Sequence, residues 1–257
     1  FQYCYNGGGV GIGDFNNDNL QDIVFTGNQV SSRIYLNNGN LAFTDISEKA
    51  KFFTDSWVTG VAIVDINSDG WDDIYLNVGG ANCNNNCPNL LFVNQGLNDE
   101  GVPFFNEEAE AYGLDDANYA QQAVFFDYDL DGDLDVYIVH NGNTTHDKNT
   151  PMPKRYLPGH LSDYLLKNET MPGIDHPVYR NVSDSLQITG RGFGLGVGIH
   201  DFNGDNLPDI YVSNDFITDD LLYINKASAA NKNPVFVESS KEYLSHETYN
   251  AMGVDIT

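Results

Sequence analysis

Short apolar runs recur along the chain in groups of four, and polar turns separate them. The clearest pair in each group flanks an acidic turn, as GVAIVD and DIYL do around residues 65 to 73. Runs rich in β-branched and aromatic residues predict strands, and two of them joined by a short turn predict a hairpin. A third run that ends in Asn and a weaker fourth run follow each hairpin, so each group predicts four short strands.

The same order of runs occurs four times. The first runs are GVGIGD, GVAIVD, QAVFFD and GVGIHD; the second begin at Asp22, Asp73, Asp135 and Asp209, the third at Ile34, Leu90, Tyr164 and Leu221, and the fourth at Phe43, Phe104, Val178 and Phe236. Four short strands per unit, repeated in series, are typical of propeller blades rather than of a sandwich. We therefore predict an all-β fold, a β-propeller with blades at about residues 1–50, 51–114, 115–189 and 190–245.

A glycine column marks the first strand of each predicted blade. The fifth residue before the acidic turn is Gly9, Gly60, Gln122 or Gly196. Glycine there indicates that strand backbones approach closely. Gly253 continues the column, so residues 246–257 are predicted to be the first strand of a further blade. We therefore expect an open portion of a ring that has more than four blades.

The acidic turns share the pattern D-x-[DN]-x-D-[GN]-x-x-D and are named loops one to four. They read DFNNDNLQD, DINSDGWDD, DYDLDGDLD and DFNGDNLPD, with successive starts 51, 62 and 74 residues apart. Oxygen-bearing side chains at positions 1, 3, 5 and 9, a tight turn near position 6 and a carbonyl at position 7 suit a cation of calcium size. Magnesium suits them less, because it requires a rigid octahedron and keeps its waters.

The predicted ligands are positions 1, 3, 5, 7 and 9 of each loop, with position 7 binding through its carbonyl. They are Asp14, Asn16, Asp18, Leu20 and Asp22 in loop one; Asp65, Asn67, Asp69, Trp71 and Asp73 in loop two; Asp127, Asp129, Asp131, Asp133 and Asp135 in loop three; and Asp201, Asn203, Asp205, Leu207 and Asp209 in loop four. We expect about four structural Ca²⁺ ions, held most tightly by loop three, which carries five aspartates. The alternative is that the loops are Asp- and Asn-rich turns that hydrogen-bond their own backbone.

The charge of the chain agrees with a cation as its partner. There are 37 Asp and Glu against 12 Lys and Arg, which gives a formal net charge of −25 at pH 7. This balance argues against nucleic acid or an anionic membrane surface as the main partner. No apolar run reaches the length of about 18 residues that a transmembrane helix needs, so no membrane span is predicted.

Two connections between the predicted strands are unusually long. In the first, Cys83 and Cys87 lie four residues apart and are predicted to form a disulfide, which indicates an extracytoplasmic compartment. The second, residues 140–163, carries a basic cluster in an otherwise acidic chain: Lys148, Lys154 and Arg155. This cluster is either a docking site for a protein partner or an anionic glycan, or part of a solvated insertion.

The acidic loops between glycine-bearing strands resemble the FG-GAP or VCBS repeats of integrin α-subunit propellers. The stretches GGGVGIGDFNNDNLQDIVFTGN and GFGLGVGIHDFNGDNLPDIYVSNDF are similar to cell-surface VCBS-repeat proteins of Bacteroidetes with ASPIC/UnbV-type propellers, which are related to cartilage acidic protein. The resemblance covers essentially the whole chain. It implies a calcium-bound β-propeller, often on a surface lipoprotein of the outer membrane, and it supplies no enzymatic activity.

Two functional hypotheses follow from these patterns. In the first, the chain is not an enzyme but a calcium-stabilised propeller that serves as a cell-surface binding, adhesion or complex-assembly module. In the second, it is a calcium-dependent polysaccharide-active enzyme of lyase type, which requires a base and a charge-neutralising cation together in one pocket. The acids lie largely at ligand positions and basic residues are few, which favours the first hypothesis.

Overall fold

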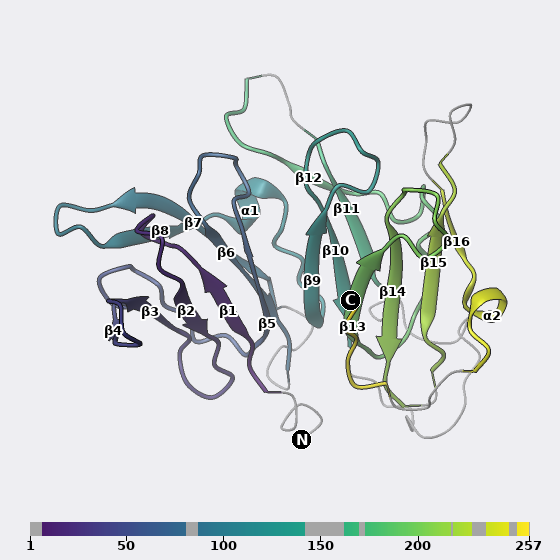
Figure 1. Cartoon of the computed structure of the whole chain (residues 1–257), viewed down its shortest axis with the longest axis horizontal. Coiled ribbons are helices and arrows are strands. Elements are labelled where there is room, and N and C mark those ends of the chain that lie inside the picture. The colour runs from purple at the N-terminus through teal and green to yellow at the C-terminus, as the bar shows by residue number, and fades with distance from the viewer. Residues whose placement is uncertain are drawn as a thin grey trace. The chain divides into compact units, whose positions relative to one another are not determined.

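The computed structural model describes residues 7–80, 87–141, 162–169, 173–216, 218–227, 235–246 and 251–256. These residues form four antiparallel sheets of four strands each (Figure 1). Within each sheet the strands lie side by side in chain order, which is the arrangement that consecutive hairpins produce. The predicted all-β fold of four-stranded units is confirmed for this part of the chain, and its sheets are consistent with propeller blades.

The chain divides into two compact units, and the first contains two of the sheets and one short helix. This unit comprises Phe1–Ala120 and Thr170–Val178. Its first sheet consists of β1 (Val10–Gly13), β2 (Asp22–Phe25), β3 (Arg33–Asn37) and β4 (Phe43–Asp45). Its second sheet consists of β5 (Val58–Val64), β6 (Asp73–Val78), β7 (Leu90–Leu97) and β8 (Pro103–Glu107), followed by α1 (Ala109–Tyr112).

The second unit comprises Gln121–Glu169 and Tyr179–Thr257 and repeats the arrangement. Its first sheet consists of β9 (Ala120–Phe126), β10 (Asp135–His140), β11 (Tyr164–Asn168) and β12 (Tyr179–Asn181). Its second sheet consists of β13 (Gly194–His200), β14 (Asp209–Asn214), β15 (Leu221–Asn225) and β16 (Phe236–Glu238), followed by α2 (Ser240–Tyr243). No helix in the described part of the chain is both long and apolar enough to cross a membrane.

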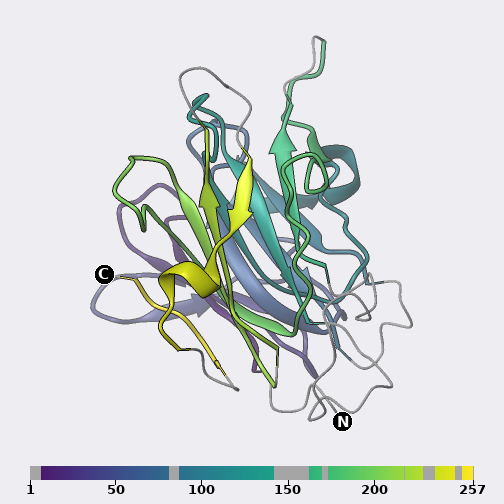
Figure 2. The ribbon, with the colours of Figure 1, turned by 90° about the vertical axis from the view of Figure 1, so that its right-hand side faces the viewer.

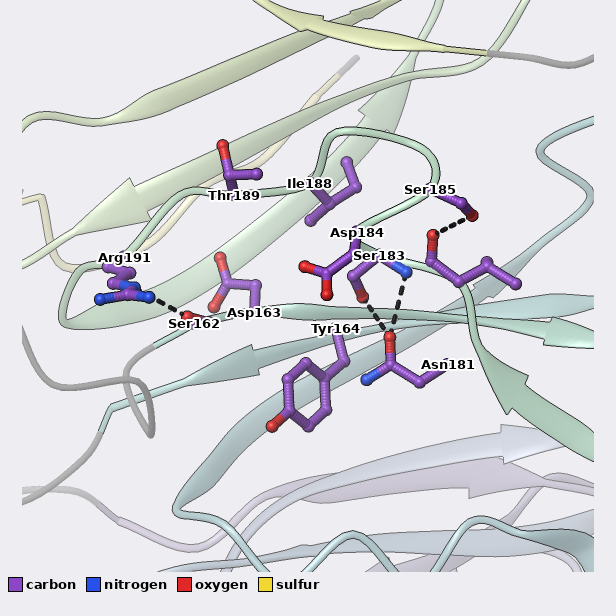
Figure 3. Close-up of a pocket in the computed structure, with 11 residues that line it drawn as sticks. Ser162, Asp163, Tyr164, Asn181, Ser183, Asp184, Ser185, Ile188, Thr189 and Arg191 are labelled. Carbon is purple, nitrogen blue, oxygen red and sulfur yellow. Dashed lines mark hydrogen bonds between the residues drawn. The ribbon is translucent and has the colours of Figure 1, made fainter. Parts of the chain in front are cut away.

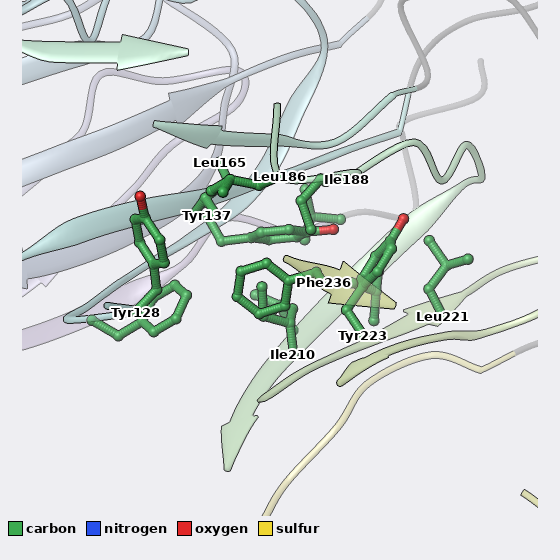
Figure 4. Close-up of a cluster of buried hydrophobic side chains, with 13 residues drawn as sticks. Tyr128, Tyr137, Leu165, Leu186, Ile188, Ile210, Leu221, Tyr223 and Phe236 are labelled. Carbon is green, nitrogen blue, oxygen red and sulfur yellow. The ribbon is translucent and has the colours of Figure 1, made fainter. Parts of the chain in front are cut away.

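Each unit has a hydrophobic core between its two sheets. In the first unit, Phe15 and Ile34 of one sheet share a cluster with Phe92 and Phe105 of the other. In the second unit the two sheets lie face to face (Figure 1, Figure 2). Figure 4 shows Phe236 at the centre of that core, surrounded by side chains from both sheets. Burying a side chain of this size contributes about 1.5–3 kcal/mol, so these cores hold the sheets of each unit together.

Glycines within β1 and directly before it allow close packing between the two sheets of the first unit. A Cβ atom on Gly9 would lie 2.9 Å from Val61 Cγ1, and one on Gly11 would lie 2.9 Å from Ile63 Cδ1. Any larger residue would therefore push the first strands of the two sheets apart. The close approach predicted from the glycine column is confirmed at Gly9.

Gln122 departs from the glycine column, and the structure gives the reason. Its side-chain Oε1 accepts a hydrogen bond of 3.2 Å from the backbone N–H of Val197, on the first strand of the next sheet. Val197 stands four residues before its acidic loop, as Val61 does before loop two. In the second unit a side-chain hydrogen bond therefore replaces the close backbone approach that glycine permits.

The C-terminal residues 251–256 were predicted to begin a further strand, and none is assigned there. The backbone N–H of Ala251 nevertheless donates to Asn214 O at 3.1 Å, just as Val58 N–H, at the start of β5, donates to Gly27 O at 3.2 Å. A Cβ on Gly196 would lie 3.2 Å from Val254 Cγ1. The segment thus takes the position on the last sheet that the first strand of a following sheet would take.

Candidate metal centre: the four acidic loops

Each acidic loop is the turn of a hairpin between the first two strands of a sheet. Position 9 of the loop is the first residue of the second strand in every case, and its side chain is fully buried: Asp22, Asp73, Asp135 and Asp209. The hairpins pair as the sequence predicts, for example with Gly13 opposite Asp22 and Val64 opposite Asp73. A buried carboxylate at position 9, where the loop meets the second strand, is therefore a feature of the repeat.

Two backbone amides hold each position 9 carboxylate. One oxygen accepts the N–H of position 2 of the same loop, at 2.8–3.3 Å. The other accepts the N–H of the Asn near the end of the third strand, at 2.7–2.8 Å. Burial raises the pKa of Asp22 to about 6 and of Asp73 and Asp135 to about 7, although these amides lower it. An ionised carboxylate in such a place is stabilised by a nearby cation.

The carboxylate at position 1 shapes the tip of the loop. Its two oxygens accept the N–H groups of positions 5 and 6, at 3.0–3.1 Å and 2.7–2.9 Å respectively. Positions 4 and 6 both have positive φ, and at position 6 the residues Asn19 and Asn206 adopt φ 67° where the other loops have Gly. Asn tolerates this left-handed conformation, so its replacement of Gly in loops one and four leaves the turn intact.

Positions 3 and 5 are joined directly in three of the loops. The side-chain amide of Asn16, Asn67 or Asn203 donates to the carboxylate at position 5, at 2.9 Å in each loop. The position 5 carboxylate also accepts the N–H of position 7, at 2.8–3.1 Å in all four loops. The structure thus brings the side chains of positions 1, 3, 5 and 9 into one turn as predicted, with oxygens that a hard cation such as Ca²⁺ prefers.

Loop three has a different network, because its position 3 is Asp129. One oxygen from each of Asp127, Asp129 and Asp135 lies within 4.8 Å of the others, so this group can hold a metal ion. The ammonium of Lys167, on β11, forms ion pairs with Asp129 and with Asp131, the latter at 3.0 Å. Burial lowers the pKa of Lys167, but these hydrogen bonds raise it above its ordinary value overall. Sequence reasoning missed Lys167, which lies 38 residues from Asp129.

In the second sheet of each unit, the Asn near the end of the third strand joins neighbouring loops. In the first unit, Asn94 Nδ2 donates to Asp72 O at 3.2 Å in its own loop and to Phe15 O at 3.0 Å in loop one. In the second unit, Asn225 Nδ2 donates to Tyr128 O at 2.9 Å in loop three. The sequence shows this Asn in all four sheets, but only the fold reveals that Asn94 and Asn225 each connect two sheets.

A second repeated polar position, which the sequence reasoning missed, lies one residue before each third strand. Asn89 and Asp163 both accept the backbone N–H of the last residue of the second strand and contact the hydroxyl of a tyrosine, Tyr75 or Tyr137. Asp220 does the same in the last sheet, with a distance of 2.7 Å to the hydroxyl of Tyr211. The first sheet has Val24 and Ser32 at the two positions, so the acid or amide occurs where the tyrosine does. Burial raises the pKa of Asp163 to about 6.

A cavity of about 620 Å³ lies in the second unit, beside the start of β11. Figure 3 shows Arg191 and Ser162 at one end and Asn181 and Ser185 at the other. Arg191 is the only cationic side chain among its lining residues, and its Nε donates to Ser162 Oγ at 3.1 Å. The cavity is polar and mixed in charge, and no motif in the sequence predicts it.

The remaining predicted site residues lie largely outside the described part of the chain. Cys83 and the basic cluster of Lys148, Lys154 and Arg155 fall there. Cys87 is described and is disulfide-bonded, but its partner falls outside the described residues, so the pairing with Cys83 stays a prediction.

Comparison with known proteins agrees with the repeat in the first unit. Residues 14–76 match the family described as FG-GAP-like repeat. The matched segment begins at position 1 of loop one and ends in β6, so it contains loops one and two and the strands between them. A search of curated proteins found no match. This part of the chain is therefore similar to an FG-GAP-like repeat, and the match supports an FG-GAP repeat protein.

Proposed function

We propose that this chain is a calcium-stabilised β-propeller module that acts without catalysis, in binding, adhesion or complex assembly at the cell surface. The observation that carries the proposal is the recurrence of one oxygen-rich loop in all four sheets, each with a fully buried carboxylate at its root. FG-GAP repeats are typical of propeller modules with binding or adhesion roles, and residues 14–76 match that family.

The loops favour a structural ion over a catalytic one. Their carboxylates are hydrogen-bonded to backbone amides of the same loop or, at position 9, also of the third strand, so an ion bound there is held within one hairpin. An ion held by a full set of protein oxygens leaves no open position for a substrate. Such an ion compensates the repulsion among the aspartates and stabilises the fold.

Thermal unfolding with and without calcium tests the proposal. One site adds about 2.7 kcal/mol to the free energy of unfolding when free calcium is at 100 times its Kd. A chelator that empties several such sites is therefore expected to lower the Tm by tens of degrees. Asp69→Ala, in loop two, is expected to reduce the calcium effect, whereas Asp99→Ala, at an exposed turn outside the loops, is not. A Tm that the chelator leaves unchanged would refute the calcium proposal.

If the chain is an enzyme, the cavity beside β11 is the best candidate for its active site. A lyase needs a base and a neutralising cation, and Arg191 is the cation that the cavity offers. Its hydrogen bond to Ser162, however, directs part of the guanidinium to the cavity wall. Incubation with acidic polysaccharides is expected to give no rise in the ultraviolet absorbance of unsaturated products. A rise that Arg191→Ala abolishes would establish the enzyme instead.

The cell-surface part of the proposal has two supports. The disulfide at Cys87 favours an oxidising compartment, and FG-GAP repeat proteins are often extracellular. We infer that the partner is a protein or a surface glycan and that the basic cluster predicted from the sequence contacts it. The finer likeness to Bacteroidetes surface lipoproteins with ASPIC/UnbV-type propellers belongs to the same proposal. Surface proteolysis of intact source cells tests it, because a protein inside the cell would be protected.

A further inference from the structure

Loop three differs from the other loops at two positions that contact each other. Its position 3 is Asp129 rather than Asn, and Lys167 precedes the last Asn of its third strand. The residues that correspond to Lys167 in the other sheets are apolar: Leu36, Val93 and Ile224. An extra acid and an extra base therefore occur together in one repeat out of four.

The ammonium of Lys167 lies among the carboxylates of the loop. It forms ion pairs with Asp129 and Asp131, and it lies 5.6 Å from the ring centroid of Tyr128. The side chains of Lys167 and Asp129 are only 26% and 13% exposed, so water screens the pair weakly. Figure 4 shows Tyr128 at the edge of the core of the second unit, which places this ion pair where the core meets the loop.

Lys167 supplies a donor that the change to Asp129 removes. In loops one, two and four the Asn at position 3 donates its side-chain N–H to the carboxylate at position 5. An ionised Asp129 has no proton to donate and repels Asp131. The ammonium hydrogen-bonds to both carboxylates and so replaces the missing amide donor.

The Asp129 carboxylate is shared between Lys167, which pairs with its Oδ2 atom, and the group that can hold a divalent ion. The group that can hold a metal ion in loop three includes Asp129, and the Asp129 Oδ1 atom is buried with no hydrogen-bond partner among the described residues. A calcium ion bound to the other oxygen of Asp129 and the ammonium repel each other at such short range, so Lys167 opposes calcium binding in this loop.

We propose that Lys167 competes with calcium for loop three, so that this loop binds the ion more weakly than loop two although it has the most carboxylates. The inference rests on the proposed function, because it takes the other loops to bind calcium. It also reverses the expectation from the sequence that loop three binds most tightly, since that expectation counted only the charges within the loop.

Hydrogen exchange measured by mass spectrometry at graded free calcium tests the inference in the whole chain. Peptides covering residues 65–77 and 127–139 report loops two and three in the same sample. In the wild type, protection of loop three is expected to need more calcium than protection of loop two. Lys167→Met keeps the apolar stem, resembles the other sheets, and is expected to lower the midpoint of loop three alone by about tenfold, equivalent to ~1.4 kcal/mol.

Two further variants make the result specific. Lys226→Met removes an exposed positive charge just after β15, and it is expected to leave the midpoint of loop three unchanged. Lys167→Gln is the second substitution, to be used if the Met variant folds poorly. If loop two responds to calcium but neither substitution of Lys167 moves loop three, the competition is wrong. If no loop responds to calcium, the proposed function and this inference both fail.

Discussion

Replacing Asn89 by Asp is expected to make the stability of the first unit depend on pH. Asn89 is fully buried, accepts the backbone N–H of Val78 at 2.8 Å and donates to the Tyr75 hydroxyl at 2.9 Å. The substitution changes one amide into a carboxyl of the same shape. Asp163 occupies the same position in the second unit and shows what such a carboxyl experiences, since burial raises its pKa to about 6.

The size and sign of the effect follow from that pKa. A rise from the ordinary value of 3.8 to about 6 is about two pKa units, or about 3 kcal/mol of preference for the protonated form. Between these two values the folded state binds more protons than the unfolded state, so the free energy of unfolding falls as the pH rises. The N89D variant should therefore match the wild type near pH 4 and be less stable by about 3 kcal/mol above pH 7.

Urea unfolding of the variant and the wild type, from about pH 4 to 8 at saturating calcium, measures the difference in free energy. Titration of the loop carboxylates is common to both proteins and cancels in this difference. Asn40→Asp is the control, because it adds the same charge at an exposed position in the turn between β3 and β4 and is expected to change stability little at any pH. A penalty for N89D that is constant with pH, or larger in acid, would refute the reasoning.

Two further predictions concern side chains that join neighbouring sheets, and urea unfolding measures both. Asn225→Ala removes a buried amide that donates to two carbonyls and is expected to lower the free energy of unfolding by about 2–3 kcal/mol. Asn37→Ala removes a partly exposed amide that donates to one carbonyl of its own loop and should lower it by less than about 1 kcal/mol. Equal losses would contradict the role of Asn225 as a link between sheets. Gln122→Leu leaves the Val197 amide without its acceptor and is expected to cost about 1–2 kcal/mol, and a Gln122→Leu variant as stable as the wild type would show that this hydrogen bond is dispensable.

The strands could be predicted from the sequence because each one carries its own local signal. The run DIYLNV in β6 is β-branched and aromatic, ends beside polar turns, and is buried at all six residues. The loops were also predictable, because positions 1, 3, 5 and 9 lie within nine residues and their geometry depends on the local turn. Repetition strengthened both predictions, since four copies with one spacing are unlikely to arise as unrelated turns.

Contacts between distant residues could not be predicted in the same way. Lys167 and Asp129 are separated by 38 residues, and their meeting depends on the register between β10 and β11. The pairing of Tyr75 with Asn89 likewise depends on which residue of β7 faces β6. A comparison of the four repeats column by column contains the signal, because Lys and Asp replace an apolar residue and Asn in the same repeat.

The hydrogen bonds of the loops also bear on what a bound ion would contribute. The position 9 carboxylate is held by two backbone amides and the position 1 carboxylate by two more, and none of these bonds requires a cation. The loop backbone is thus held by hydrogen bonds from the chain itself, unlike a zinc finger, which folds only around its metal. A cation bound there would act mainly on the charges, by relieving the repulsion among the aspartates and stabilising the buried carboxylate at position 9 in its ionised form. On the proposal that the loops bind calcium, each sheet provides oxygens for one ion, and in loop three Lys167 adds a positive charge of the chain's own.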